Sequence, residues 1–216
     1  MSELPILYQI VIWAIPVLFA VTLHEVGHGW AAKQLGDTTA EDMGRLTVNP
    51  IKHIDPVGTI AVPFVTSFFG GFIFGWAKPV PVNWNQLRNK KRDIALVALA
   101  GPFANLLMIV FWLIIAKLFI ASAEQGNFFA NLLTLMAWAG IVINSLLMIL
   151  NLLPLPPLDG SRVVFSLLPT QLAYRYAKIE PYGLMILVIL LASGALFSII
   201  GPIISWIEKS MYMLII

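Results

Sequence analysis

His24, Glu25 and His28 are the residues of this sequence whose types and spacing could do chemistry. Residues four apart share one face of a helix, so the two imidazoles can bind the same metal ion. Glu25 falls about 100° further round the helix, where its carboxylate can reach a water on the metal and act as a general base. The pattern predicts a hydrolytic zinc centre, and a pair of structural histidines is the alternative.

Asp159 is the residue that we expect to complete this centre, because zinc with two histidines needs a third protein ligand. Glu25 and Asp159 both lie at the edges of long apolar runs. Asp159 follows the proline-rich segment 151–158, which prevents an ordinary helix and leaves carbonyl groups unpaired. Such backbone is tolerated at membrane depth only inside protein or beside a wet cavity, which a hydrolase also needs. A proline-rich helix end with Asp159 in a turn is the structural alternative.

The composition is that of a membrane protein. Hydrophobic residues make up 59% of the 216 residues and charged residues 11%, against about 25% charged in soluble domains. The absence of cysteine excludes a thiolate zinc site. We therefore expect an all-α integral membrane protein of about five to six membrane segments, forming a single domain over residues 1–216.

The elements that must position these residues can be read from the uncharged runs, which are 4–23, 56–77, 94–116, 125–158 and 181–207. The second run contains glycines, a proline and aromatic residues that are poor helix signals. If both histidines and Asp159 meet at one metal, an even number of crossings separates them. The runs 94–116 and 125–158 already provide two crossings, so the run 56–77 should enter and leave on one side. We therefore expect 56–77 to be a short β or re-entrant region between the first and second full helices. Gly201 and Pro202 are expected to end the last helix, at about residues 182–200.

The basic residues support one orientation of this topology. It gathers most of them in loops on the same side, which is the cytoplasm by the positive-inside rule; they are Lys33, Arg45, Lys52, Lys78, Arg88, Lys90, Lys91, Arg92, Arg162, Arg175 and Lys178. The metal centre is then expected nearer the cytoplasmic face of a multi-pass protein. His53, the third histidine, is interpreted as a solvated or capping loop residue.

Three segments, 24–28, 101–105 and 151–160, match in order the motifs of the site-2 protease family of intramembrane zinc metalloproteases, peptidase family M50. The chain resembles its minimal prokaryotic members, and we see no room for a PDZ or CBS domain. The resemblance implies one Zn²⁺ per chain held by His24, His28 and Asp159, with Glu25 as catalytic base. It also implies a transmembrane protein substrate and a location in the prokaryotic plasma membrane.

Four further residues are candidates for substrate binding. Asn105 and Asn151 match family asparagines near the site. Val80 and Val82 alternate with prolines, so that in a strand their N–H groups would face one edge and could pair with an extended substrate. Packing between helices and protection of an edge against aggregation are the structural alternatives. The expected partners are the substrate and the lipid bilayer, with no nucleic acid, and the oligomeric state is not predicted.

Two other classes of protein could use such residues. A membrane metal-ion transporter would be expected to show internal repeats and several acids at the midplane, and the sequence shows neither. A catalytically silent membrane-protein binder would have no need of Glu25 between the two ligands. The sequence therefore favours an intramembrane zinc endopeptidase that hydrolyses peptide bonds within or near transmembrane segments.

Overall fold

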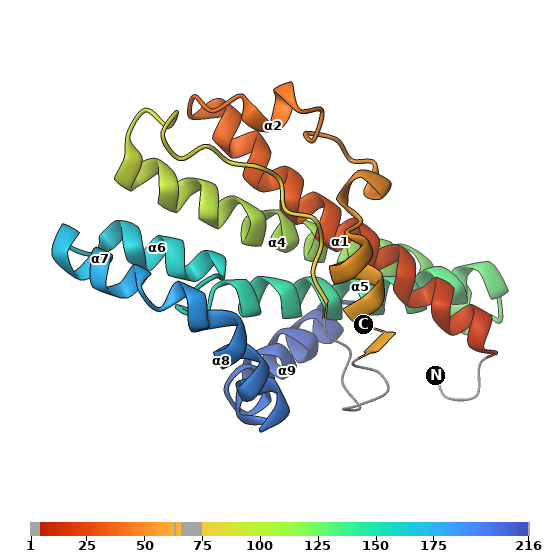
Figure 1. The fold of residues 1–216 in the computed structure, drawn as a ribbon. Helices are drawn as coiled ribbons and strands as arrows, with labels where there is room; N and C mark the ends of the chain where they lie inside the picture. Colours follow the sequence, from red (N-terminus) through yellow and green to blue (C-terminus); the bar gives the residue numbers. More distant parts are fainter. Residues whose placement is uncertain (1–4, 63, 66–74, 216) are drawn as a thin grey trace.

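The computed structural model describes residues 5–62, 64–65 and 75–215, and their regular structure is helical, as expected for an all-α chain (Figure 1). No strand occurs in these ranges. The elements are α1 (Ile6–Gln34), α2 (Thr39–Asp42), the short turns η1 (Pro50–His53) and η2 (Pro56–Ala61), α4 (Lys90–Glu124), α5 (Phe128–Asn151), α6 (Asp159–Leu167), α7 (Thr170–Ala177), α8 (Glu180–Ala192) and α9 (Ala195–Ile215).

Helices α1, α4 and α5 are long and apolar enough to cross a membrane, and α8 with α9 forms a fourth candidate bent by 75°. The described residues therefore give three to four spans where five to six membrane segments were expected. Part of the difference is that the run 56–77 includes residues outside the described ranges, and that the last run and the segment after it form one bent candidate. The β or re-entrant region expected at 56–77 begins with η2, but residues 63 and 66–74 lie outside the described residues.

Small residues bring α1, α4 and α5 together. The three helices pack against one another in pairs, and α4 lies between α1 and α6 (Figure 1). A Cβ atom at Gly27 of α1 would lie 2.7 Å from the carbonyl oxygen of Ala100 on α4, and one at Gly140 of α5 would overlap the indole of Trp112. Apolar helices in lipid associate through such close backbone approach, so these glycines hold the site's helices in contact.

Asparagine side chains cap the amino-terminal ends of α4 and α5. The side chain of Asn89 accepts a hydrogen bond from the N–H of Arg92 at the start of α4, and that of Asn127 accepts one from Ala130 at the start of α5. These caps satisfy N–H groups that have no partner within the helix. The connection 125–127 between α4 and α5 is short, so the two helices are antiparallel neighbours.

Two helix boundaries differ from expectation. Helix α1 continues beyond the apolar run to Gln34, so the histidines lie inside the helix rather than at its end. The break in the last run falls at Gly194 instead of Gly201 and Pro202, which lie within α9. Gly194 has a φ of 74°, a left-handed conformation that commonly ends helices, and this φ places the bend between α8 and α9.

An extended segment, residues 75–83, which we call the strap, crosses the face of α1. Its alternate N–H groups are bound one after another: Trp76 donates to Gly58 O, Lys78 to His53 O and Val80 to the carboxylate of Glu25. The buried guanidinium of Arg45 donates to the carbonyl oxygens of Lys78 and Pro79. The strap is therefore attached to α1 and to the segment that follows it.

Of the two roles that the sequence suggested for His53, a solvated or a capping loop residue, the structure contradicts the first. Its side chain is buried, with 2% of the residue exposed, and Nε2 lies 2.8 Å from the carbonyl oxygen of Thr47. Its own carbonyl receives the N–H of Lys78, so His53 is packed beneath the strap. Covering of η1 by the strap is the long-range contact that the local sequence did not reveal.

Candidate metal centre

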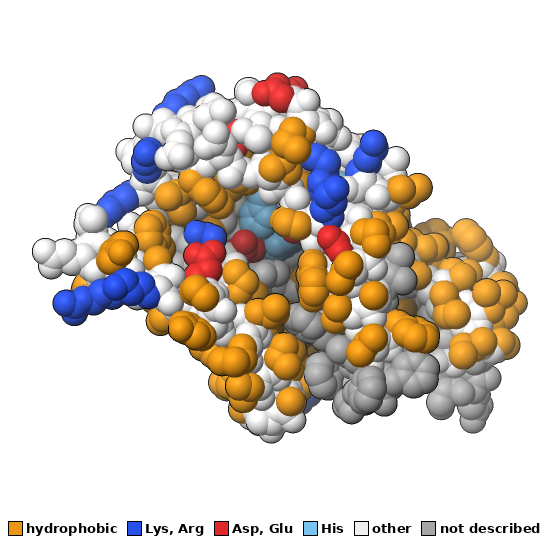
Figure 2. Space-filling model, in the orientation of Figure 1, with side chains coloured by type: hydrophobic (Ala, Val, Ile, Leu, Met, Phe, Trp, Pro, Cys, Tyr) orange, Lys and Arg blue, Asp and Glu red, His pale blue; other side chains and the backbone are white. Residues whose placement is uncertain are grey.

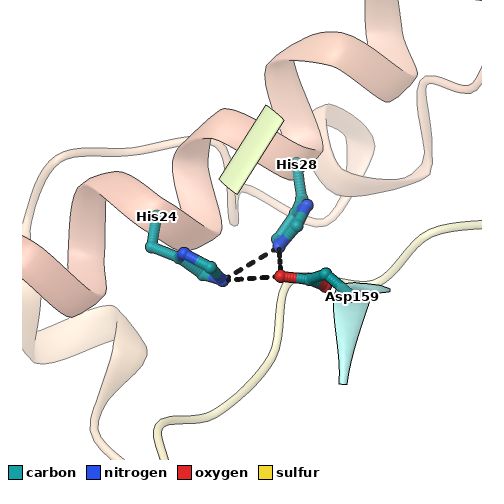
Figure 3. Close-up of side chains that lie close together, drawn as sticks. All are labelled: His24, His28 and Asp159. Carbon is teal, nitrogen blue, oxygen red and sulfur yellow. Dashed lines mark hydrogen bonds and ion pairs between the residues drawn. The ribbon is translucent and has the colours of Figure 1, made fainter. Parts of the chain in front are cut away.

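The two histidines of α1 face Asp159, the first residue of α6 (Figure 3). His24 Nε2 and His28 Nε2 are 3.1 Å apart, and Asp159 Oδ2 lies 3.2 Å from the first and 3.3 Å from the second. These atoms form a nearly equilateral triangle. Residues from two distant parts of the sequence thus converge on one point, and together they form a group that could hold a metal ion.

Hydrogen bonds on the far side of each ring fix which imidazole nitrogen carries the proton. His24 Nδ1 lies 2.7 Å from Asn105 Oδ1, and His28 Nδ1 lies 2.7 Å from the carbonyl oxygen of Val97. Both partners are oxygen acceptors, so each Nδ1 carries the hydrogen and each Nε2 keeps a lone pair. This is the usual arrangement of metal-binding histidines, in which an outer acceptor orients the ring.

The three facing atoms fit a cation between them. With both Nε2 atoms unprotonated, their 3.1 Å approach is not a hydrogen bond, and the buried Asp159 Oδ2 has no hydrogen-bond partner among the described residues. Three acceptors this close are unfavourable unless positive charge lies between them. Ligand atoms about 2.0–2.2 Å from a tetrahedral zinc lie about 3.3–3.6 Å from one another. The triangle is close to this size, and two imidazoles with a carboxylate suit zinc better than magnesium or calcium.

Glycines make room for the three side chains. A Cβ atom at Gly101 of α4 would overlap the imidazole of His28 and approach that of His24 to 2.7 Å. A Cβ at Gly160 would overlap the carbonyl groups of Leu152 and Leu153 at the end of α5. Gly160 therefore allows α6 to start close to α5, which places Asp159 opposite the histidines. The position of Asp159 at the start of α6 also suits its negative charge.

Glu25 lies beside the centre and contacts the strap. Its Oε2 accepts a hydrogen bond from the N–H of Val80 at 2.7 Å, which is the one hydrogen bond of this carboxylate found among the described residues. Glu25, His24, His28 and Asp159 all line a cavity of about 600 Å³. Figure 2 shows the histidines recessed in a hollow between hydrophobic side chains, with basic side chains nearer its rim. A carboxylate, three possible ligands and space for a peptide therefore lie together.

Arg162 lines another part of this cavity, and Tyr176 contacts the proline-rich segment near it. Arg162 on α6 forms an ion pair of 2.7 Å with Glu180 at the start of α8, and its guanidinium lies 5.6 Å from the ring centre of Trp84. The hydroxyl of Tyr176 donates to the carbonyl oxygen of Pro154 at 2.9 Å. Burial raises the pKa of Tyr176, so this hydroxyl stays protonated and able to donate. Leu187 of α8 also lines the cavity.

Comparison with known proteins assigns the family. The profile of Peptidase family M50 matches residues 115–194, which include Asp159. The proposed zinc metalloprotease YwhC of Bacillus subtilis is 36% identical over 177 residues, which cover 82% of this chain and 78% of YwhC. The chain belongs to peptidase family M50. Proposed zinc metalloproteases named Rip2, from Mycolicibacterium smegmatis and Mycobacterium tuberculosis, are 33% and 25% identical to this M50 chain and cover 83% and 88% of it. The matched parts are 66% and 70% of the two Rip2 proteins. No solved structure matches it.

Three of the four candidate substrate-binding residues line the cavity of this M50 chain, and the fourth does not. Val80, Val82 and Asn151 line the cavity. Asn105 is fully buried in α4 and is not part of the cavity lining. Its side-chain amide forms hydrogen bonds with His24, Ala20 and Asn144. Substrate binding by the first three stays a prediction, and the contacts of Asn105 are those of a residue that orients His24.

Sequence reasoning missed three contributors to the centre. They are the carbonyl of Val97, the side chain of Asn144 and the missing side chain of Gly101. A carbonyl carries no signal in the sequence, and a glycine in a membrane helix is equally expected where helices pack closely. Asn144 carried a usable signal, because an amide in the middle of an apolar membrane helix needs a buried polar partner.

Proposed function

We propose that this M50 chain is an intramembrane zinc endopeptidase that hydrolyses peptide bonds within or near transmembrane segments of membrane proteins. The observation that carries the proposal is the convergence of His24, His28 and Asp159 on one point, with Glu25 beside them on the wall of the same cavity. Helices α1 and α4, which contribute residues to the lining of this cavity, are membrane-spanning candidates. Membership of peptidase family M50 supports the same conclusion.

The residues divide the chemistry among them. His24, His28 and Asp159 would hold the zinc, which when bound polarises a peptide carbonyl and lowers the pKa of a water to about 7. Glu25 accepts the proton of the attacking water and passes it to the departing amine. The N–H of Val80 holds one carboxylate oxygen of Glu25 against the cavity wall. The second oxygen is then left for the proton transfer.

A substrate helix hides its peptide bonds, so the chain to be cleaved must be extended before attack. We propose that it lies along the strap, where Val80 and Val82 line the same cavity as Asn151. Backbone pairing with an extended segment would hold it there. The N–H of Val80 is already bound by Glu25, so pairing at that position requires this contact to open.

The position of the centre along α4 supports an orientation in the membrane. Val97, whose carbonyl oxygen meets His28, is only seven residues, roughly 10 Å, from the start of α4 at Lys90. The basic residues Lys90, Lys91 and Arg92 stand at that end. We therefore place the centre nearer the cytoplasmic face of a prokaryotic plasma membrane. Because α4 and α5 are two crossings, we also propose that 56–77 enters and leaves on one side.

Replacement of Glu25 by glutamine tests the proposal. Glutamine keeps the shape of the side chain but cannot accept the proton, so the purified Glu25→Gln protein should bind zinc as the wild type does and fail to cleave single-span membrane proteins in detergent. A metal-ion transporter or a silent binder would keep its activity after this change. Cleavage by the Glu25→Gln protein at the wild-type rate would refute the assignment of the base.

A further inference from the structure

A buried asparagine of α5 is linked to the metal centre although it does not touch a metal ligand. Asn144 and Asn105 are both 0% exposed. Asn105 Nδ2 donates to Asn144 Oδ1 at 2.9 Å, and Asn144 Nδ2 donates to the carbonyl oxygen of Gly140 at 2.8 Å. With the contact between Asn105 and His24, a chain of hydrogen bonds runs from α5 through α4 to α1.

The direction of this chain is set by backbone carbonyls, which can only accept. Asn144 must turn its NH₂ group towards Gly140 O, so it presents its oxygen to Asn105. Asn105 must turn its own NH₂ group towards that oxygen and towards the carbonyl oxygen of Ala20, 3.2 Å away. A rotated Asn105 amide would place its oxygen against both acceptors. The oxygen of Asn105 is therefore presented to His24, which has to donate from Nδ1.

We propose that Asn144 is a positioning residue for the metal centre, holding Asn105 in the orientation that keeps the proton of His24 on Nδ1 and leaves Nε2 free to bind metal. The proposal rests on the zinc site proposed above. Without Asn144, one N–H of Asn105 loses its partner in a buried environment, and only the longer bond to Ala20 O still orients the amide. His24 can then take the other tautomer for part of the time.

The first test is zinc affinity, measured by competition with a chelator on the purified full chain in detergent. Asn144→Leu removes the acceptor while keeping the branching of the side chain, and it should weaken zinc binding about 10-fold to 100-fold, as the loss of outer partners does at other metal sites. Ser145→Ala is the matched control. Ser145 is the next residue of α5, equally buried, and its hydroxyl has no hydrogen-bond partner among the described residues. Its loss should leave zinc affinity unchanged.

A double-mutant cycle separates positioning from a general effect on packing. Asn105→Leu should weaken zinc binding at least as much as Asn144→Leu. If Asn144 acts through Asn105, the double variant should bind zinc no more weakly than Asn105→Leu alone. Additive losses would overturn the proposal. Should Asn144→Leu fail to fold, Asn144→Ala serves in its place, since it also lacks the acceptor and the same loss is expected.

The second test needs no metal. Long-range ¹H–¹⁵N NMR of the histidine rings in the metal-free protein shows which nitrogen carries hydrogen. In the wild type, His24 should carry hydrogen on Nδ1, and in Asn144→Leu part of the population should lack it there. His28 is the internal control, because its partner is the backbone carbonyl of Val97. An unchanged His24 in Asn144→Leu would overturn the inference whether or not the wild type binds zinc.

Discussion

Replacement of Gly101 by alanine should weaken zinc binding by this protein more than it lowers the free energy of unfolding. In an ordinary helix this substitution is favourable by about 1 kcal/mol, because glycine is a poor helix former. Here the added Cβ would lie 2.7 Å from His24 Cε1 and would overlap the ring of His28. Carbon atoms in contact are normally about 3.5–4.0 Å apart. One or both rings must therefore move by about 1 Å.

That movement is large on the scale of the metal centre. The three facing atoms are 3.1–3.3 Å apart, already close to the separation expected of zinc ligands. A shift of about 1 Å in one corner breaks the triangle and stretches a hydrogen bond of 2.7 Å to Asn105 or Val97. We expect zinc affinity to fall by about 100-fold, the upper end of losses from disturbed outer contacts. The cost of the crowding itself is about 1–3 kcal/mol, partly offset by the helix preference.

The assay is a chelator titration of bound zinc, combined with thermal unfolding in detergent. Gly201→Ala is the matched control, because a Cβ atom at this glycine of α9 has no neighbour within 4 Å. We expect it to bind zinc normally and to be at least as stable as the wild type. If Gly101→Ala bound zinc with wild-type affinity, the account of Gly101 as the residue that leaves space for the two imidazoles would be wrong.

Three further predictions follow from named contacts. Val80→Pro removes the N–H that binds Glu25, so cleavage of single-span membrane proteins should fall about 10-fold or more at unchanged zinc content. Val80→Ala keeps the N–H and should retain most of the activity in the same assay. Asp159→Asn replaces an anionic ligand, so zinc affinity should fall by more than roughly 100-fold, and retention of zinc in a chelator titration would contradict the assignment. Glu180→Gln breaks a partly exposed ion pair with Arg162 and should change the free energy of unfolding by less than about 1 kcal/mol. A larger loss in a denaturant titration would show that this pair, rather than apolar packing, keeps α8 against α6.

Local rules account for the part of the site that the sequence could predict. The spacing of His24 and His28 places them on one helix face whatever the rest of the chain does. Asp159 could be paired with them because charged groups at membrane depth need partners and the chain offers few acids there. The structure brings these three residues together, and their role as ligands is what the zinc experiments test.

Contacts between distant segments account for what the sequence did not predict. The bond from Val80 to Glu25 and the bond from Asn105 to Asn144 join residues 55 and 39 positions apart. Neither pair has a periodicity or a motif that relates its members. Burial of His53 has the same origin, since the strap that covers it comes from later in the chain.

Helix boundaries were mispredicted where glycine and proline compete. Gly201 with Pro202 was expected to interrupt the last apolar run, yet α9 passes through both residues. Proline removes only one N–H bond, and membrane helices tolerate this loss. Gly194, with its φ of 74°, reverses the local handedness of the backbone, and the chain bends there. The expected five to six membrane segments are not confirmed, because the described residues give three to four candidate spans.

The three candidate ligand atoms come from α1 and α6, with more than a hundred residues of chain between His28 and Asp159. An ion held by all three would act as a crosslink, closing that long loop much as a disulfide would in a protein that has no cysteine. Chelation should therefore loosen the tether between the amino-terminal helix and everything after residue 151. Limited proteolysis should report it first as new cuts in the proline-rich connection 152–158.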